Sequence, residues 1–234
     1  MQGLDPENIL NREAALRFGQ TTSSRFEPLR VTASSGFSLV EMLVVIAIVI
    51  VLMAVVIPAS SSLMGGMNIG RSAGMVTDEL NFARQTALSR NRDVEVRFYR
   101  LGAKLDGNDK KFRAVRSFLI EGLDSASWKP LSRLKQFPEP IIISDDPTFS
   151  TLLDVGNGHS GVKQESETLP GQGTVEYVKF LVRANGGTSL KPVTEKWFLT
   201  LYSQKAKVSG GGLPANYYTV QIDPVTGRTR SYRP

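Results

Sequence analysis

The sequence has no cysteine and only one histidine, His159, among its 234 residues. Without cysteine there can be no disulfide, no zinc–thiolate site and no cysteine nucleophile, and one histidine cannot form a histidine-pair metal motif. Most enzyme classes are therefore disfavoured, and we expect no catalytic residues, no metal site and no cofactor. The formal net charge is +6, which is compatible with contact to nucleic acid or anionic lipid but requires neither.

The sequence does contain one long apolar run, MLVVIAIVIVLMAVVI at residues 42–57, and the run extends back to Phe37 with only Ser38 and Glu41 as interruptions. At about 1.5 Å per helical residue, residues 37–57 would span roughly 31 Å, close to the ~30 Å hydrocarbon core of a bilayer. No polar residue recurs at helical spacing after Glu41, as it would in a helix lying on a protein core. The run predicts a transmembrane helix at residues 37–58.

Glu41 decides which kind of membrane segment this is. A cleaved secretory signal peptide has a shorter apolar region, of roughly 7 to 15 residues. A simple single-span anchor fits the length but gives Glu41 no role, and a carboxylate in lipid costs about 2.5 to 3.5 kcal/mol on insertion scales. The carboxylate is therefore expected to have a partner.

Residues 36–41, GFSLVE, resemble the processing site of type IV pilin-like proteins, which pilins share with type II secretion pseudopilins. The resemblance implies that a prepilin peptidase cuts between Gly36 and Phe37 and methylates the new amino terminus of Phe37. Glu41 would be the fifth mature residue and Pro58 the twenty-second, where the family has its glutamate and its helix-kinking proline. We expect the amine of Phe37 to pair with Glu41 of a neighbouring subunit, so that both charges are compensated only after assembly.

The leader would comprise residues 1–36, which is long for this class. Its four arginines are balanced by four acids, and only Arg30 lies close to the apolar run, where a positive flank is expected on the cytoplasmic side. The charged residues are Arg12, Arg17, Arg25 and Arg30 against Asp5, Glu7, Glu13 and Glu27. An extended leader and a later translation start near Val31 are both compatible with the sequence.

The helical pattern continues over residues 59–92. Four glycines between Gly65 and Gly74 each cost up to about 1 kcal/mol in a helix interior, so this part is expected to be loose or locally melted. Farther along, apolar residues recur at helical spacing and predict a stripe that packs on a sheet. The stripe comprises Val76, Leu80, Ala83, Ala87 and Leu88.

Residues 93–234 are predicted to form a β-rich head, and the fold class is α+β, with the long helix packed on an antiparallel sheet. Five alternating or apolar runs predict strands, at residues 94–101, 112–121, 175–184, 195–203 and 216–223. PVTG at 224–227 predicts a turn between two short strands. Residues 121–174 are richer in Gly, Pro, Ser and Asp and are expected to be an irregular insertion with one short strand at 141–144.

Two stretches of the head, ELNFARQTALSRNRDVEVRF at 79–98 and TVQIDPVTGRTR at 219–230, resemble the H-type minor pseudopilins of type II secretion and the T-type fimbrial minor pilins linked to DNA uptake. The overall pattern also resembles the pilin-like cassette proteins of Verrucomicrobia. The resemblance implies a single-pass inner-membrane protein with a periplasmic head. Its implied partners are the prepilin peptidase, other pilin or pseudopilin subunits and inner-membrane lipid.

Three other segments contain residues of the kinds found in metal or catalytic sites. DGNDKK begins like a calcium loop at Asp106, but the twelfth position is Ser117 instead of a glutamate, so a hairpin turn is favoured. Asp145 and Asp146 could bind calcium as loops in some pseudopilins do, and a solvated turn is favoured there. His159 lies in a Gly-rich stretch without a second histidine and is expected to be a surface loop residue.

Arg228, Arg230, Tyr232 and Arg233 make the carboxyl-terminal segment cationic and aromatic. Such residues can hold DNA phosphates and base faces, although a strand edge protected by charge is favoured over nucleic-acid binding. The expected function is that of a minor pilin or pseudopilin that acts by assembling into a pseudopilus or pilus-like filament. The alternatives are a DNA-binding minor pilin for DNA uptake and a binding domain on an uncleaved anchor.

Overall fold

The computed structural model describes residues 36–103, 107–122, 128–155, 161–192, 196–206 and 212–234, with the backbone alone for 55–65. The chain divides into two compact units, Met1–Val51 and Leu52–Pro234. Helix α2, Leu39–Arg90, begins in the first unit and ends in the second. Of the expected leader at 1–36, only Gly36 is among the described residues.

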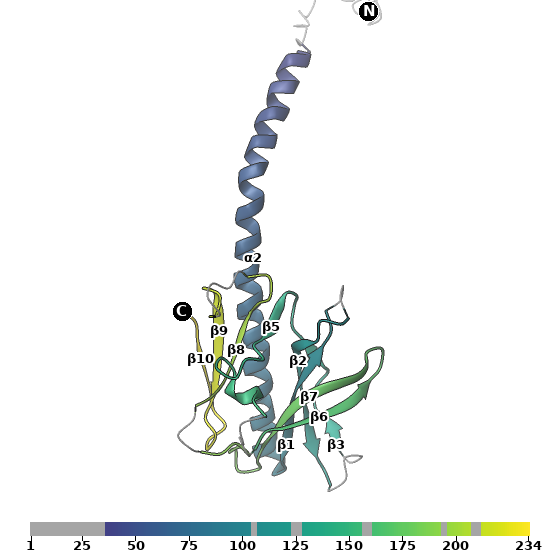
Figure 1. Ribbon diagram of the computed structural model, residues 1–234, viewed down its shortest axis with the longest axis vertical. Coiled ribbons are helices and arrows are strands. Elements are labelled where there is room, and N and C mark those ends of the chain that lie inside the picture. Colours follow the sequence, from purple (N-terminus) through teal and green to yellow (C-terminus); the bar gives the residue numbers. More distant parts are fainter. Residues whose placement is uncertain (1–35, 104–106, 123–127, 156–160, 193–195, 207–211) are drawn as a thin grey trace, which may run out of the picture. The chain divides into compact units, whose positions relative to one another are not determined.

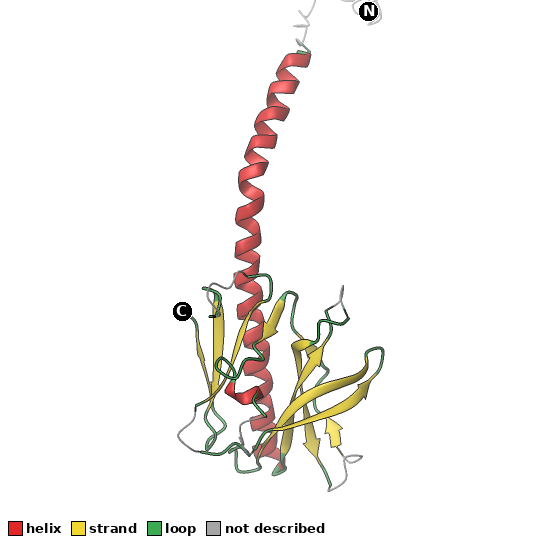
Figure 2. Ribbon diagram, viewed as in Figure 1, coloured by secondary structure: helices red, strands yellow, loops and turns green. Residues whose placement is uncertain are grey.

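Helix α2 is continuous from Leu39 to Arg90 (Figure 2). It starts where the amide of Met42 donates to the carbonyl of Ser38, 3.1 Å away. It ends at Arg90. The next residue, Asn91, has a left-handed φ of 50°, and the amide of Arg92 donates back to the carbonyl of Ala87, as in a Schellman motif. The helix thus ends about two residues earlier than expected.

The glycine-rich part of α2 is helical, in contrast to the looseness expected there. Ile69 and Ala73, which alternate with the glycines, are 1% and 0% exposed. Their burial in the core offsets the intrinsic cost of glycine in a helix, which is why this stretch holds its conformation. Within the described residues, no helix is both long and apolar enough to cross a membrane. The span expected at 37–58 stays a prediction, since its last four side chains lie outside the described residues.

Ten strands of the described chain form one antiparallel sheet, which confirms the α+β class (Figure 1). The order is β10-β9-β8-β5-β2-β1-β7-β6, and β3 and β4 both pair with β2. The bounds are β1 Val94–Leu101, β2 Lys111–Ile120, β3 Trp128–Pro130, β4 Lys135–Gln136, β5 Ile141–Ile143, β6 Lys163–Leu169, β7 Gly173–Val182, β8 Trp197–Ser203, β9 Tyr217–Ile222 and β10 Thr229–Tyr232.

The segment 121–174 is more regular than expected. It contains β3, β4, β5 and β6 together with a short 3-10 helix, Thr151–Leu153. The longest of these strands, β6, forms a hairpin with β7 over the register from Lys163 opposite Lys179 to Leu169 opposite Gly173. Its sequence, KQESETL, lacks the apolar alternation that marks a strand, because its inward side chains are charged and pair with other charges.

The main core lies between α2 and one face of the sheet. Ile69, Val76 and Ala83 of the helix belong to the same buried cluster as Val96 and Phe98 of β1. Leu80 and Ala87 of the expected stripe are also buried, whereas Leu88 is 43% exposed. The stripe therefore packs on the sheet as expected, except for its last member.

Part of the opposite face, formed by β1, β2 and β7, is buried as well. Tyr99 and Leu101 of β1 pack with Ala114 of β2 and with Val175 and Tyr177 of β7 in a second, smaller cluster. Strand β1 therefore has almost no exposed side chain, and its alternation separates two buried faces instead of a buried and a solvated one.

One short strand, β5, joins the two parts of the sheet. β5 pairs with β8 over three residue pairs, Ile141–Ser203, Ile142–Tyr202 and Ile143–Leu201. Its pairing with β2 consists of Phe112 opposite Ile143. Few backbone hydrogen bonds therefore join the β10-β9-β8 part to the β2-β1-β7-β6 part.

Candidate functional site

The expected cleavage site lies in an extended segment just before α2. Gly36 and Phe37 are exposed, and the Phe37 side chain is 74% exposed. This backbone precedes the helix and is exposed, as a segment that enters the active site of a peptidase must be. At Pro58 the backbone is helical, and its side chain lies outside the described residues.

Glu41 occupies the first turn of α2 and is exposed. The amino-terminal end of a helix favours a negative charge through the helix dipole, which gives the carboxylate a local reason to be tolerated there. Around it, apolar side chains are exposed from Leu39 at 80% to Met53 at 57%. An exposed apolar surface of this length is typical of a segment that is covered by lipid or by other chains.

The four residues of the predicted cationic tail are brought together at one edge of the sheet. Arg228, Arg230, Tyr232 and Arg233 are all exposed, and β10 pairs with β9 alone. Arg228 and Arg230, with Lys196, line a depression of about 430 Å³. This placement is compatible with both interpretations of the tail, namely an edge strand protected by charge and a surface that binds anions.

The PVTG turn before β10 is tightly fixed. Asp223 accepts the amides of Val225 and Thr226, and these backbone hydrogen bonds lower the pKa of Asp223. The side chain of Arg84 in α2 donates to the carbonyl of Thr226, 2.7 Å away. Gly227 has φ 63°, which favours glycine. The turn is thereby held against the helix, and it sets the direction of β10.

The other expected loops behave as turns where they are described. Asp145 forms an ion pair with Lys111 at 3.0 Å, and Asp146 accepts the amide of Thr148 at 2.8 Å. Among the described residues, no group of three or more His, Cys, Asp or Glu could hold a metal ion. Asp106 and His159 lie outside the described residues.

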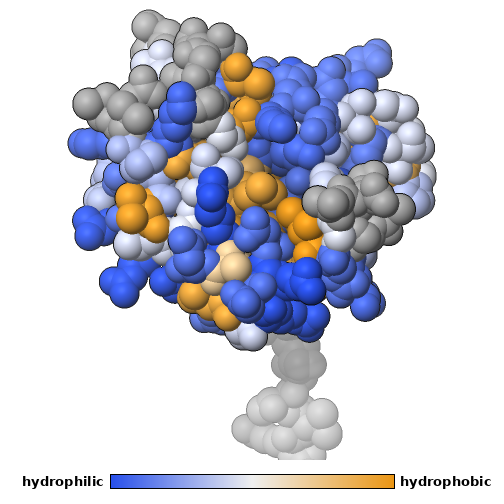
Figure 3. Space-filling model, turned by 90° about the horizontal axis from the view of Figure 1, so that it is seen from below, coloured by the Kyte–Doolittle hydropathy of each residue, from blue (hydrophilic) through white to orange (hydrophobic). Residues whose placement is uncertain are grey.

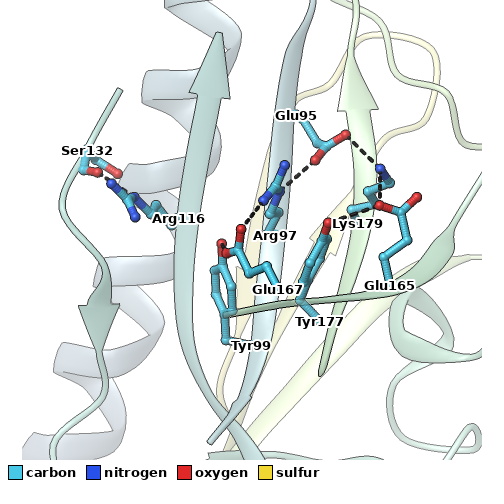
Figure 4. Close-up of polar contacts among 9 residues, drawn as sticks. All are labelled: Glu95, Arg97, Tyr99, Arg116, Ser132, Glu165, Glu167, Tyr177 and Lys179. Atoms are coloured by element: carbon cyan, nitrogen blue, oxygen red, sulfur yellow. Dashed lines mark hydrogen bonds and ion pairs between the residues drawn. The ribbon is translucent and has the colours of Figure 1, made fainter. Parts of the chain in front are cut away.

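A set of charged residues that the sequence did not predict lies on part of the sheet face opposite α2, over β1, β7 and β6 (Figure 4). We call Glu95, Arg97, Lys179, Glu165 and Glu167 the charged cluster. Arg97 Nε lies 2.6 Å from Glu95 Oε1, and Arg97 Nη1 lies 2.6 Å from Glu167 Oε2. Lys179 Nζ lies 2.7 Å from Glu165 Oε2 and 3.2 Å from Glu95 Oε2. Both glutamates of β6 are therefore bound to cations of β1 and β7.

Aromatic side chains enclose the charged cluster. The Arg97 guanidinium lies 4.0 Å from the ring centre of Phe118, 4.6 Å from Tyr177 and 5.1 Å from Trp128. Each contact can add a cation–π interaction of about 0.5 to 2 kcal/mol. The cluster replaces the apolar contacts that would otherwise bind β6 to the sheet.

Two tyrosine hydroxyls complete the hydrogen bonds of the β6 glutamates. Tyr99 donates to Glu167 and Tyr177 donates to Glu165. Burial, followed by the hydrogen bond to Glu167, raises the pKa of Tyr99. Burial raises the pKa of Glu165, but hydrogen bonds from Lys179 and Tyr177 outweigh it, and the net pKa of Glu165 is lowered. The alternation of Glu95, Arg97 and Tyr99 along β1 is the one signal in the sequence that could have revealed this cluster.

A further buried carboxylate, also missed from the sequence, joins α2 to the sheet. Glu79 is 0% exposed and accepts hydrogen bonds from the hydroxyls of Ser117 in β2 and Ser132. Lys135 Nζ of β4 lies 2.8 Å from Glu79 Oε2. The three partners fix the rotation of the helix against the head.

Apolar side chains elsewhere on the head are dispersed. In the view of Figure 3 they lie in separate groups within a mainly hydrophilic surface. Val225 and Tyr232, at 64% and 51%, are among the exposed large side chains of the head. The long exposed apolar surface of the described chain is therefore that of α2.

A family model, the prokaryotic N-terminal methylation motif, matches residues 32–57. The match includes Gly36, Phe37, Glu41 and the apolar run, and it supports a relation to the type IV pilin-like family, whose members a prepilin peptidase processes. It covers a small part of the chain and none of the head. No curated protein and no solved structure matches the chain.

Proposed function

We propose that this protein is a minor pilin-like or pseudopilin-like subunit of a type II secretion pseudopilus or a type IV pilus-like filament. Cleavage after Gly36 and methylation of Phe37 yield the mature subunit. Residues 37–58 anchor it in the inner membrane with the head in the periplasm. The subunit acts by assembling with other subunits, not by catalysis.

One observation carries this proposal. A single carboxylate, Glu41, lies in the first turn of an exposed apolar helix, five residues after Gly36 and inside the matched motif. In lipid, an unpaired carboxylate is costly. A free amine at Phe37 of a neighbouring subunit offsets that cost, so pairing favours the filament over the dispersed subunit.

The test is the intact mass and amino-terminal sequence of the protein purified from membranes of its own host. A chain that begins at N-methylated Phe37 supports the proposal. An intact Gly36–Phe37 bond would instead favour a binding domain on an uncleaved anchor, and a cut after the apolar run, near Ala59, would favour an ordinary signal peptide.

The exposed arginines of β10 favour a second candidate, a DNA-binding minor pilin. Arg228 and Arg230 sit one residue apart on either side of Thr229, beside a depression that Lys196 also lines. Phosphate contacts of this kind weaken steeply as salt rises. If the candidate is right, the full chain in detergent retards duplex DNA at low salt, and replacing both arginines with alanine abolishes the shift.

The matched control for that experiment is the double variant Arg133→Ala with Lys205→Ala. Both residues are exposed on the head, and the variant loses the same two positive charges. Equal loss of retardation in the two double variants would mean that net charge, and not the β10 edge, holds the DNA. No retardation at any salt concentration would exclude the candidate.

A further inference from the structure

The end of the head at which α2 terminates is one continuous surface built from three parts of the chain. A Cβ added at Gly186 would lie 3.1 Å from Leu88 Cδ2, and one at Gly227 would lie 2.5 Å from the carbonyl oxygen of Gly186. The end of the helix, the turn at 183–187 and the turn at 224–227 are therefore in contact. We call the exposed side chains of this end the helix-end surface, namely Leu88, Arg90, Arg92, Arg183 and Val225.

The helix-end surface is cationic. Among the described residues, no acid forms an ion pair with Arg90, Arg92 or Arg183. The helix dipole favours a cation at Arg90, in the last turn of α2. It does not account for Arg183, which follows strand β7. Three arginines without a counter-charge thus lie at one end of the head.

The acids nearest to these arginines already have partners. Asp93 Oδ1 accepts the amide of Ala184 at 2.9 Å, and Glu121 Oε1 lies 3.9 Å from Lys129 Nζ. The positive charge of the surface is therefore not neutralised within the described chain, which favours an anionic partner.

Two aliphatic side chains are exposed at the same end. They are Leu88, in the last turn of α2, and Val225, in the PVTG turn. That turn is fixed, because Asp223 accepts the amide of Val225 at 2.9 Å and Arg84 donates to the carbonyl of Thr226. Figure 3 looks at this end of the head and shows small apolar groups beside strongly hydrophilic ones. The arginines and the aliphatic side chains are thus offered to a partner together.

We infer that the helix-end surface docks on a bilayer that contains anionic phospholipids. The arginines bind lipid phosphates, for which the planar guanidinium is suited because it can donate two parallel hydrogen bonds. Val225 and Leu88 enter the boundary between the head groups and the acyl chains, as apolar side chains of membrane-surface proteins do. A partner that offered charge alone would leave these two side chains in water.

The position of this surface indicates which membrane it contacts. Helix α2 is continuous from Pro58 to Arg90, a length of about 48 Å at 1.5 Å per residue. The surface therefore lies at the end of the head remote from Pro58, and the bilayer it contacts is one that faces the head. This location rests on the proposed span at 37–58, whereas the binding of lipid does not.

Vesicle sedimentation tests the inference with the full chain. The chain is held through its apolar segment in nanodiscs of phosphatidylcholine and mixed with sucrose-loaded vesicles, either of phosphatidylcholine alone or with added phosphatidylglycerol. The test variant is Arg90→Gln with Arg92→Gln. The matched control is Arg133→Gln with Lys205→Gln, which removes the same charge at exposed positions between β3 and β4 and after β8.

The expected result is that the chain sediments with the phosphatidylglycerol vesicles, that it does not sediment with the neutral ones, and that added salt weakens the binding. Loss of both helix-end arginines weakens binding by about thirtyfold, and the matched control binds within a few-fold of wild type. Val225→Ser weakens binding several-fold without changing the charge, because less apolar surface enters the bilayer.

Three results would overturn the inference. Equal binding to neutral and anionic vesicles would show that the arginines do not select lipid phosphates. Equal weakening in the two double variants would mean that the net charge of the head, and not the helix-end surface, attracts the vesicles. Unchanged binding of Val225→Ser, with polyglutamate or duplex DNA bound more tightly than the vesicles, would identify an acidic macromolecule as the partner instead. None of these results bears on the amino-terminal sequence of the mature protein, so the proposed function stands or fails separately.

Discussion

Replacing Glu79 with alanine should destabilise the head far more than any exposed acid of the same helix. Glu79 is fully buried and holds three partners on the sheet side, Ser117, Ser132 and Lys135. Alanine removes the only carboxylate in this contact and leaves the hydroxyl of Ser117, itself 0% exposed, without its acceptor. The variant therefore tests whether a polar contact positions α2 on the sheet.

The magnitude follows from the three partners. Each hydroxyl bond to a charged acceptor contributes about 1.5 to 3 kcal/mol. The ion pair with Lys135 adds less than about 1 kcal/mol, because that lysine side chain is 34% exposed. Ser132 can turn toward water, and alanine is a slightly better helix former. The net loss is about 3 kcal/mol, and for a unit of this size each kcal/mol lowers Tm by about 2 to 4 °C.

Thermal unfolding of the full chain in nonionic detergent, followed by tryptophan fluorescence, measures this loss. Both tryptophans, Trp128 and Trp197, lie in the head, so the signal reports the head and not the apolar part of α2. Asp78→Ala is the matched control, since Asp78 is the exposed neighbour of Glu79 on the same helix. We expect Tm to fall by about 6 to 12 °C for Glu79→Ala. If the two variants melt within a degree of each other, the contact does not stabilise the head and the reasoning is refuted.

Three further predictions concern other parts of the chain. Glu41→Ala should be cleaved normally but enter filaments poorly, because the Phe37 amine of the next subunit loses its partner; sheared surface fractions from the host measure this, and wild-type filament yield would contradict the pairing. The pKa of Tyr99 in the folded state is raised above its ordinary value of 10.0. The contribution of the Tyr99 hydroxyl to stability is therefore complete below pH 10.0 and is lost as the pH rises through the pKa of the folded state. In urea unfolding, the stability advantage of wild type over Tyr99→Phe should therefore be constant below about pH 10 and shrink above it, and an advantage that grows there would contradict the assignment. Gly227→Ala should lower the free energy of unfolding more than Gly171→Ala does. Both glycines have positive φ, but a Cβ at 227 would lie 2.5 Å from a backbone oxygen, whereas a Cβ at 171 would meet open space. Equal unfolding midpoints for the two variants would contradict the close approach at 227.

The parts of the fold with a local apolar pattern could be predicted from the sequence. Strand β1, VEVRFYRL, alternates from Val94 to Phe98, and its apolar residues Val94, Val96 and Phe98 lie in the main core as an alternating strand requires. Its other residues, most of them on the opposite face, are also buried except for Arg100. Arg97 is buried because it pairs with Glu95 of the same strand, with Glu167 of β6 and with three aromatic rings of other strands. The partners on other strands have no signature within β1 itself.

The remaining features depend on contacts between distant segments. Strand β6 was missed because Glu165 and Glu167 resemble solvent-facing residues in the sequence, and their ion pairs with Lys179 of β7 and Arg97 of β1 appear only in the folded sheet. Glu79 sits within the apolar stripe of α2, and a single polar residue there gives no hint of Ser117. The amino-terminal motif, by contrast, is carried by consecutive residues from Gly36 to Glu41 and could be read without any structure.

The short strand β5 has a mechanical consequence for the head. It joins the two parts of the sheet through three pairs with β8 and one pair with β2, so a pulling force across this boundary meets little resistance from the backbone. The resistance comes instead from the side chains of α2, because one buried cluster contains Ile69 and Val76 of the helix together with Val96 of one part of the sheet and Val220 of the other. Helix α2 therefore holds the two parts of the sheet together. A force applied along the helix is transmitted to both the β10-β9-β8 part and the β2-β1-β7-β6 part before the pairing at β5 is strained.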